Sequence, residues 1–430
     1  MAAPAARRLG QLTLLESATL VSGTGNGVAI VALPWLVLER TGSATAAGMV
    51  AAATVLPLLV ASLLSGTVVD LVGRRRTAVI SDALSCLAVA AIPLVDATVG
   101  LSVGVLIALA ALGSVFDPAG ITARETLLPA AAVAAGWRLD RANSVHEAVW
   151  GVAFLVGPGV GGLFIATVGA ASTLWVTAAG FAVSLILISA VRLPGASAPA
   201  AHERPAGFWR GTGEGLAFVW RDPVLRATCL LTMAVVALYL PVEGVVLPVY
   251  FTAEGAPARL GTVIMAMSVG GIVGALAYGR WGRRVRRRTA FVLALVGVGV
   301  PLLGMAALPP FPVMVILAVL TGVCYGPIAP LTNYAMQTRT PEQLRGRVMG
   351  VVTSSEYAAG PAGYLLGGPL VDALGVRPAF LLLTGALFVV ALAAVPARGL
   401  RALDDPPRYA VSPDETPPPP HLTVPFCDHP

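Results

Sequence analysis

Six acidic residues lie inside long apolar stretches of this chain, where charged side chains are costly and usually face a cavity. They are Glu16, Asp82, Asp117, Glu147, Glu243 and Glu356. A carboxyl group that alternates between apolar surroundings and water can bind and release a proton. We predict Glu243 and Glu356 as proton-coupling residues, since Glu356 lies near the middle of its stretch and Glu243 lies between Pro241 and Pro248. The alternative is a locally paired acid, or one that only complements a substrate's charge. The other four lie nearer the stretch ends, where a carboxylate reaches water or pairs with an arginine.

A second group of chemically distinctive residues joins two apolar stretches. It consists of Gly66, Asp70, Gly73, Arg74 and Arg75. An acid at the end of one helix can approach the positive N-terminus of a neighbouring helix and pair with nearby arginines. We predict that this group forms a gate that closes one mouth of the protein. Membrane topology alone would explain the arginines, but it would not require the Gly-Asp-Gly spacing.

A third group combines small residues with one proline. It consists of Gly157, Pro158, Gly161 and Gly162. Small residues let helices approach closely, and an internal proline bends a helix because it lacks a backbone donor. Polar or aromatic residues near the middle of other apolar stretches are candidates for a substrate cavity: Asn26, Phe154, Tyr239 and Tyr325. Packing between helices is the alternative role for each of these residues.

The elements that position these residues follow from composition. The chain has 430 residues, of which 57% are hydrophobic and only 12% charged, so it is far more apolar than a soluble domain. A bilayer core of about 30 Å requires about 20 helical residues, because backbone groups in lipid must bond within the segment. We predict twelve spans, at 12–38, 44–70, 77–95, 101–123, 143–168, 172–192, 225–250, 258–279, 289–308, 312–335, 347–371 and 378–397.

The distribution of arginine predicts the orientation. Alternating the links between the two faces puts Arg40, Arg259 and Arg377 on one side and every other arginine on the other. The basic side is expected to be cytoplasmic, so both termini are predicted to be cytoplasmic in an inner (cytoplasmic) membrane. The arginines form no continuous basic face, which argues against nucleic-acid binding.

The chain also repeats itself. Pro118 and Pro129 recur as Pro330 and Pro341 at one common offset, and a weaker copy of the gate motif follows Ala275. Two inverted or parallel repeats with a site at their interface are common in secondary transporters. We therefore divide the chain into a six-helix bundle (1–192), a linker (193–224) with an amphipathic helix from Gly207, a second six-helix bundle (225–403) and a disordered tail (404–430).

These motifs resemble the major facilitator superfamily over positions from about 10 to about 400. The gate motif matches that family's loop between helices two and three, except that Leu71 replaces a basic residue. The stretches from Phe116 to Pro158 and from Gln337 to Val348 are similar to the macrolide-efflux and enterobactin-exporter branch. The resemblance implies an all-α membrane protein with twelve helices in two pseudo-symmetric bundles. It also implies an antiporter role for the Gly157 group, whereas the family's helix-four arginine is absent from 101–123.

The predicted function is secondary active transport, with proton-coupled export of a small amphipathic drug, macrolide or siderophore-like molecule by alternating access. Lipid, lysolipid or nutrient transport and a non-transporting membrane sensor remain alternatives. An enzyme is not expected, since there is no Gly-rich phosphate loop, nucleophile elbow or metal-spaced His/Cys set. No cofactor or metal is predicted; the expected partners are the substrate, protons and the lipid bilayer, with a functional monomer.

Overall fold

Residues 5–193 and 208–405 are described by a computed structural model, and every regular element in these ranges is helical. The first half contains α1 (Ala5–Thr41), α2 (Ala44–Val72), α3 (Arg74–Thr98), α4 (Val103–Ala135), α5 (Leu139–Val168) and α6 (Ala170–Ala190). The helix α7 (Phe208–Arg221) connects the halves. The second half contains α8 (Pro223–Pro241), η2 (Val242–Val246), α9 (Leu247–Ala253), α10 (Pro257–Trp281), η3 (Gly282–Arg284), α11 (Arg287–Ala306), α12 (Phe311–Tyr325), α13 (Ile328–Arg339), α14 (Glu342–Leu374), α15 (Val376–Ala394) and η4 (Arg398–Asp404).

The helices have the length and composition of membrane spans. Among the described residues, ten spans are long and apolar enough to cross a bilayer; α8, η2 and α9 form one of them, and α12 and α13 another. The two further long helices, α2 and α14, have 29 and 33 residues and exceed the length that a bilayer core requires. Each predicted span falls on one of these segments, and the all-α membrane fold is confirmed.

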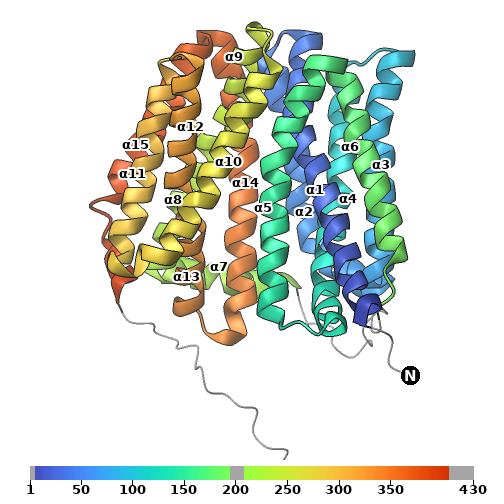
Figure 1. Ribbon diagram of the computed structural model, residues 1–430. Coiled ribbons are helices and arrows are strands. Elements are labelled where there is room, and N and C mark those ends of the chain that lie inside the picture. The colour runs from blue at the N-terminus through green and yellow to red at the C-terminus, as the bar shows by residue number, and fades with distance from the viewer. Residues whose placement is uncertain (1–4, 194–207, 406–430) are drawn as a thin grey trace, which may run out of the picture.

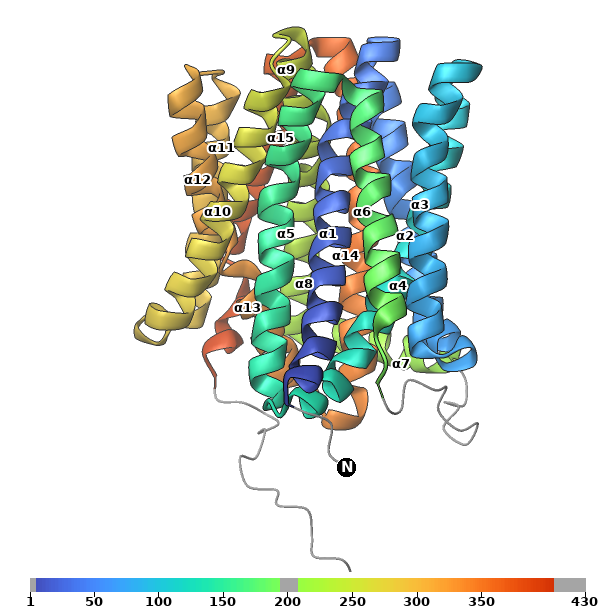
Figure 2. The ribbon, with the colours of Figure 1, turned by 45° about the vertical axis from the view of Figure 1, so that its right-hand side comes forward.

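The two halves stand side by side, with their helices roughly along one common direction (Figure 1). Between the halves, α2 packs along α14 and α5 packs along α10. We call the end where α1 begins and α2 meets α3 the arginine-rich end, because it carries Arg74 to Arg76 and Arg284 to Arg288. The opposite end carries Arg40 and Arg259. Figure 2 shows α5 and α10 close together at the opposite end and apart at the arginine-rich end.

Apolar side chains cover both the inside and the outside of the bundle. Leu87, Ile186, Leu276 and Leu366 are more than 65% exposed, as expected of side chains that face lipid. Many hydroxyl groups inside the helices bond to the backbone of the preceding turn. Thr19, for example, donates to the carbonyl of Leu15 at 3.0 Å.

The helix predicted to end at position 123 is longer in the structure. α4 continues to Ala135 and ends at Gly136, whose φ of 71° is left-handed and favours glycine. Hydropathy locates the apolar part of a helix rather than its end. The predicted span therefore left out Arg124, although this residue lies within α4. α7 occupies the region of the predicted amphipathic helix. The stretch 194–207 and the predicted disorder beyond 405 lie outside the described residues.

Candidate functional site

A cavity of about 690 Å³ lies between the two halves, within the size range of drug-binding pockets. Its wall combines residues of α1, α2, α4 and α5 with residues of η2 and α14. Toward the arginine-rich end the lining residues Glu125, Thr353 and Tyr357 are exposed, whereas Val50 and Gly244 on the other side are buried. The cavity therefore reaches solvent from the arginine-rich end.

Three carboxyl side chains line this cavity: Asp117 and Glu125 from α4 and Glu243 from η2. Among the described residues of the wall there is no arginine or histidine, and the chain has no lysine. The remaining wall is largely aliphatic and aromatic. Charge interactions are stronger in such surroundings than in water, so the cavity favours a molecule that is both apolar and positively charged.

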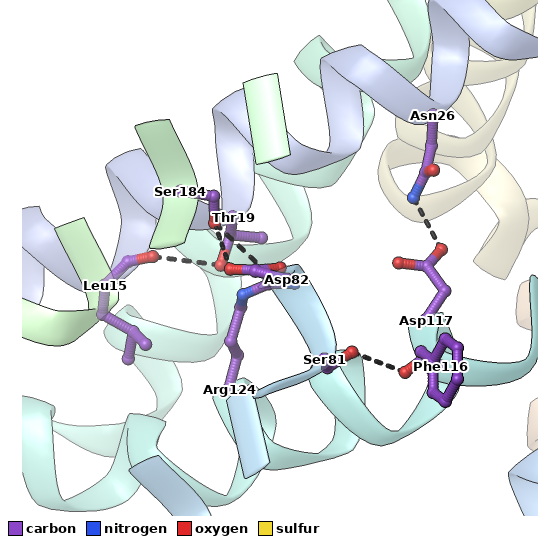
Figure 3. A network of polar contacts seen from close by, with 9 residues as sticks. All are labelled: Leu15, Thr19, Asn26, Ser81, Asp82, Phe116, Asp117, Arg124 and Ser184. Carbon is purple, nitrogen blue, oxygen red and sulfur yellow. Dashed lines mark hydrogen bonds and ion pairs between the residues drawn. The ribbon is translucent and has the colours of Figure 1, made fainter. Parts of the chain in front are cut away.

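Asp117 is held in the wall by Asn26. The Asn26 Nδ2 donates to Asp117 Oδ2 at 2.7 Å, which joins α1 to α4 (Figure 3). Both residues line the cavity, and a contact of Asn26 with substrate stays a prediction. Asp117 was predicted to lie nearer a helix end, but it faces the cavity from within α4, and its second carboxylate oxygen makes no hydrogen bond among the described residues.

A buried ion pair lies behind this wall. The Arg124 guanidinium contacts Asp82 Oδ1, and Ser184 donates to Asp82 Oδ2 at 2.7 Å (Figure 3). The side chains of Arg124 and Asp82 are 1% and 2% exposed. Burying two charges costs less when they are paired and further hydrogen-bonded. Ser184 bonds to both partners here, while Nε and Nη1 of Arg124 have no partner among the described residues. The cluster joins α3, α4 and α6 and stiffens the side of the first half that carries Asp117.

Glu243 enters the cavity through an irregular part of its helix. It lies in η2, a π-helical segment of five residues that directly follows Pro241. Proline cannot donate its backbone hydrogen bond, and single π-helical turns often occur at functional sites. The Tyr364 ring packs so closely that a Cβ on Gly244 would be 2.6 Å from its Cε1. Proline and glycine together therefore set the position of the Glu243 carboxyl.

The predicted aromatic residues separate into two places. Phe154 lines the cavity and stacks on Trp150, with ring centroids 5.7 Å apart. Tyr239 and Tyr325 stack on each other at 5.1 Å within the second half, and neither is among the described residues of the cavity wall. Glu356 is half-buried near Tyr325 and also lies outside that wall.

Several lining residues were missed from the sequence. They are Glu125, Trp150, Thr353, Tyr357 and Tyr364. Helical spacing could have found them, since residues four apart share one helix face. Trp150 is four residues before Phe154, and the Asp117 face of α4 continues through Ile121 to Glu125.

Comparison with known proteins agrees with this architecture. The transporter family described as "Transmembrane secretion effector" matches residues 3–424. The chain belongs to the major facilitator superfamily. It is 49% identical over 398 residues to the multidrug efflux pump Tap of Mycolicibacterium fortuitum, covering 92% of this chain and 97% of that protein. Tap of Mycobacterium tuberculosis is also 49% identical, covering 92% of this chain and 95% of that one.

More distant proteins agree on the family and the fold. Macrolide efflux protein A of Streptococcus pyogenes is 21% identical over 383 residues, covering 87% of this chain and 92% of that protein. The crystal structure of the nucleoside transporter NupG superposes with a TM-score of 0.74 at 12% identity, over 90% of this chain and 98% of that one. These relatives and fold neighbours are transporters rather than enzymes. The chain is a multi-pass membrane transporter with a small-molecule substrate.

The described part of the major facilitator gate motif shows why it needs a glycine. Gly73 has a φ of 97°, which glycine adopts readily, and it lets α2 end and α3 begin without an intervening loop. The Arg75 guanidinium donates to the carbonyl of Ser189 at the end of α6, within the first half. Gly66 and Asp70 lie in α2, but their side chains lie outside the described residues, so the Asp70 gate stays a prediction.

At the opposite end, this superfamily member is closed by a contact between its halves. Asp372 of α14 accepts hydrogen bonds from Ser43 Oγ at 3.0 Å and from the backbone N–H groups of Ala44 at 2.9 Å and Thr45 at 2.8 Å. Those backbone groups are unpaired donors at the start of α2, where negative charge is favourable. A Cβ on Gly368 would lie 2.6 Å from the carbonyl oxygen of Ala44, so the two helices touch there.

The predicted antiporter-like motif contacts two different helices. Cβ atoms on Gly157 and Gly161 would lie 2.6 Å from Gly27 Cα and 3.1 Å from the carbonyl oxygen of Val28, both on α1. A Cβ on Gly162 would lie 2.5 Å from the carbonyl oxygen of Pro257 on α10. Through this motif, α5 packs against α1 of the first half and against α10 of the second half. Pro158 lies inside α5, next to Gly157.

Proposed function

We propose that this transporter exports amphipathic, positively charged small molecules in exchange for protons. The observation that carries the proposal is the cavity between the halves, lined by Asp117, Glu125 and Glu243 without a basic side chain among its described residues. The name of the relatives, multidrug efflux pump, supports export of drug-like compounds. Aromatic side chains such as Phe154 and Tyr357 supply contact area for a flat or bulky apolar body.

Competition for the same carboxylates explains how the two movements are coupled. A carboxylate in the cavity binds either the positive charge of a substrate or a proton, so a proton that arrives from the far side displaces the substrate. Exchange of one proton for one monovalent cation moves no net charge, so the difference in proton concentration drives it, and each tenfold difference supplies about 1.4 kcal/mol. Glu243 and Asp117 face this cavity from opposite halves, which makes them the first candidates for coupling. Glu356 remains a candidate outside the cavity.

We further propose that both termini are cytoplasmic and that the membrane is the inner (cytoplasmic) one. Support comes from the concentration of arginine at one end of the bundle. With this orientation, the structure has its cavity open to the cytoplasm and its outer end closed, which is the state that loads an export substrate. We also propose that the transporter functions as a monomer. Cysteines placed at Arg40 and Arg284 should be labelled from opposite faces of the membrane.

The function is tested with ethidium, a lipophilic cation, in inverted membrane vesicles that contain the full chain and have an acidic lumen. Ethidium should accumulate and release protons, as followed by a pH-sensitive dye. Asp117→Asn and Glu243→Gln should each reduce this exchange at least tenfold, because the wall loses a negative charge. Glu254→Gln, in the loop between α9 and α10, is the matched control and should behave like the original protein.

Two outcomes would contradict the proposal. Unchanged exchange in the Asp117→Asn and Glu243→Gln double variant would exclude the cavity carboxyls. Movement of a fluorescent lysolipid or a nutrient but not of ethidium would favour those alternative substrates, whereas ethidium binding without flux in reconstituted liposomes would favour a sensor.

A further inference from the structure

A buried histidine lies directly behind the cavity wall. His146 of α5 is 5% exposed, and its Nδ1 lies 3.2 Å from both carboxylate oxygens of Glu16 on α1. Its Nε2 lies 3.3 Å from the indole Nε1 of Trp150, one helical turn further along α5. Glu16 is itself 7% exposed, so neither contact is mediated by bulk water. Helix α5 thereby connects a buried acid to a residue that lines the cavity.

The partners of the ring determine its protonation state. An indole N–H can only donate a hydrogen bond, so Nε2 of His146 must accept it and carry no proton. The remaining proton is then on Nδ1, which donates to the Glu16 carboxylate. A neutral imidazole satisfies both contacts at once. A doubly protonated ring cannot, because its Nε2–H would point at the N–H of Trp150.

Trp150 is part of the cavity wall. It lines the cavity and stacks on Phe154, which lines it too. If the indole loses its acceptor, the contact that holds it in place is gone, and the stacked pair is free to rearrange. Protonation of His146 can therefore alter the cavity wall through Trp150, although His146 itself does not line the cavity.

Acidic groups face the ring from three helices. Besides Glu16 on α1, the carboxyls of Glu125 on α4 and Glu147 on α5 are close enough to act on His146 electrostatically. Glu125 lines the cavity and is exposed, so it provides a route by which protons reach the ring from solvent. The surrounding negative charge compensates an imidazolium, which makes a second, protonated state of the site accessible.

We propose that His146, together with Glu16, is a proton-binding site, and that protonation of Nε2 releases the Trp150 indole from its position in the cavity wall. His146 acts through Trp150 as a positioning residue rather than by touching the substrate. The role of this site in transport rests on the proposed proton-coupled export. The contact between the His146 ring and the Trp150 indole does not depend on that function. Proton binding here changes the cavity at its entrance, between the arginine-rich end and Asp117.

The site is tested on the full chain in nanodiscs with Trp150 as the only tryptophan, the other six being replaced by phenylalanine. The fluorescence of Trp150 should titrate between pH 5 and 8, where histidine changes charge. In His146→Gln this change should disappear, because the amide can donate to Glu16 and accept from Trp150 but cannot take up a proton. His202→Gln, in the predicted linker, is the matched control and should leave the titration intact.

A transport readout separates the two proposals. In vesicles, His146→Gln should still move ethidium, but the dependence of its rate on pH should flatten by at least threefold relative to the original protein. A Trp150 titration that persists unchanged in His146→Gln would overturn the site. If the titration depends on His146 but the original protein moves no ethidium, the site stands and the proposed export function fails.

Discussion

The carboxylate of Asp372 caps the first turn of the helix that begins at Ala44, with 2.9 Å between Asp372 Oδ1 and the Ala44 nitrogen. This contact joins the C-terminal end of α14 to the N-terminal end of α2, and it must break whenever the opposite end opens. The gate predicted for Asp70 would lie at the other end of α2.

Removal of the Asp372 cap should favour the state in which the opposite end is open. An N-terminal cap contributes about 0.5–2 kcal/mol and the helix dipole about 0.3–1 kcal/mol. The two together are about 0.8–3 kcal/mol, so Asp372→Ala should shift the equilibrium by roughly 4- to 150-fold. Spin labels at Val99 and Arg377, which lie in different halves at that end, should report longer distances. Unchanged distances, or an equal shift in the control Glu254→Gln, would contradict this role.

The buried pair of Arg124 and Asp82 should control the stability of the first half. Asp82→Ala leaves the Arg124 guanidinium buried without a counter-charge, at a cost of about 3–5 kcal/mol in unfolding free energy. Ser184→Ala removes only one neutral partner and should cost about 1 kcal/mol. Denaturation of the purified protein in detergent measures both values. If Arg124→Met restored no stability to Asp82→Ala, the loss would have another cause than the unpaired charge.

Glycines at the contact between α5 and α10 should be sensitive to a single methyl group. Gly162→Ala places a Cβ 2.5 Å from the carbonyl oxygen of Pro257, which the backbone cannot avoid without moving α10. We expect at least tenfold slower ethidium transport and a destabilised outer closure. Gly104→Ala is the matched control, because nothing lies within 4 Å of its new Cβ. Equal transport by the two variants would show that the contact between α5 and α10 is not essential.

Aromatic contact in the cavity should contribute to substrate affinity. Phe154→Ala removes the ring that stacks on Trp150 and should weaken ethidium binding about three- to tenfold, equivalent to about 0.6–1.4 kcal/mol. Phe164 lies on the same helix, is exposed and is not among the described cavity residues, so Phe164→Ala should bind ethidium as before. Fluorescence anisotropy of ethidium on the protein in nanodiscs measures both. A similar loss in both variants would indicate a general change in α5.

Much of the fold could be predicted from the sequence because lipid leaves few choices. A backbone in hydrocarbon must satisfy its own hydrogen bonds, so each apolar stretch of about 20 residues becomes a helix. The length of an apolar stretch predicts where a helix crosses the bilayer. It does not predict how far the helix continues outside the hydrocarbon core. For that reason the predicted span stopped at 123 and left out Arg124, which lies inside α4 and pairs there with Asp82.

The candidate site was only partly predictable. Asn26, Phe154 and Glu243 face the cavity, whereas Glu356, Tyr239 and Tyr325 are not among its described lining residues. Lipid and the protein interior are similarly apolar. The hydrophobic pattern of a membrane helix therefore does not show which of its faces points toward the cavity and which toward lipid.

By itself, the sequence determined which segments lie in the membrane, which family the chain belongs to and where its unusual glycines, prolines and acids stand. Only the tertiary structure decided which acids share one cavity, that His146 has Glu16 and Trp150 as partners, and that Asp372 caps a helix of the other half. The physical reason is the range of the interactions. Bilayer insertion depends on local composition, whereas a hydrogen bond between residues hundreds of positions apart depends on how the packed helices are rotated and where they touch.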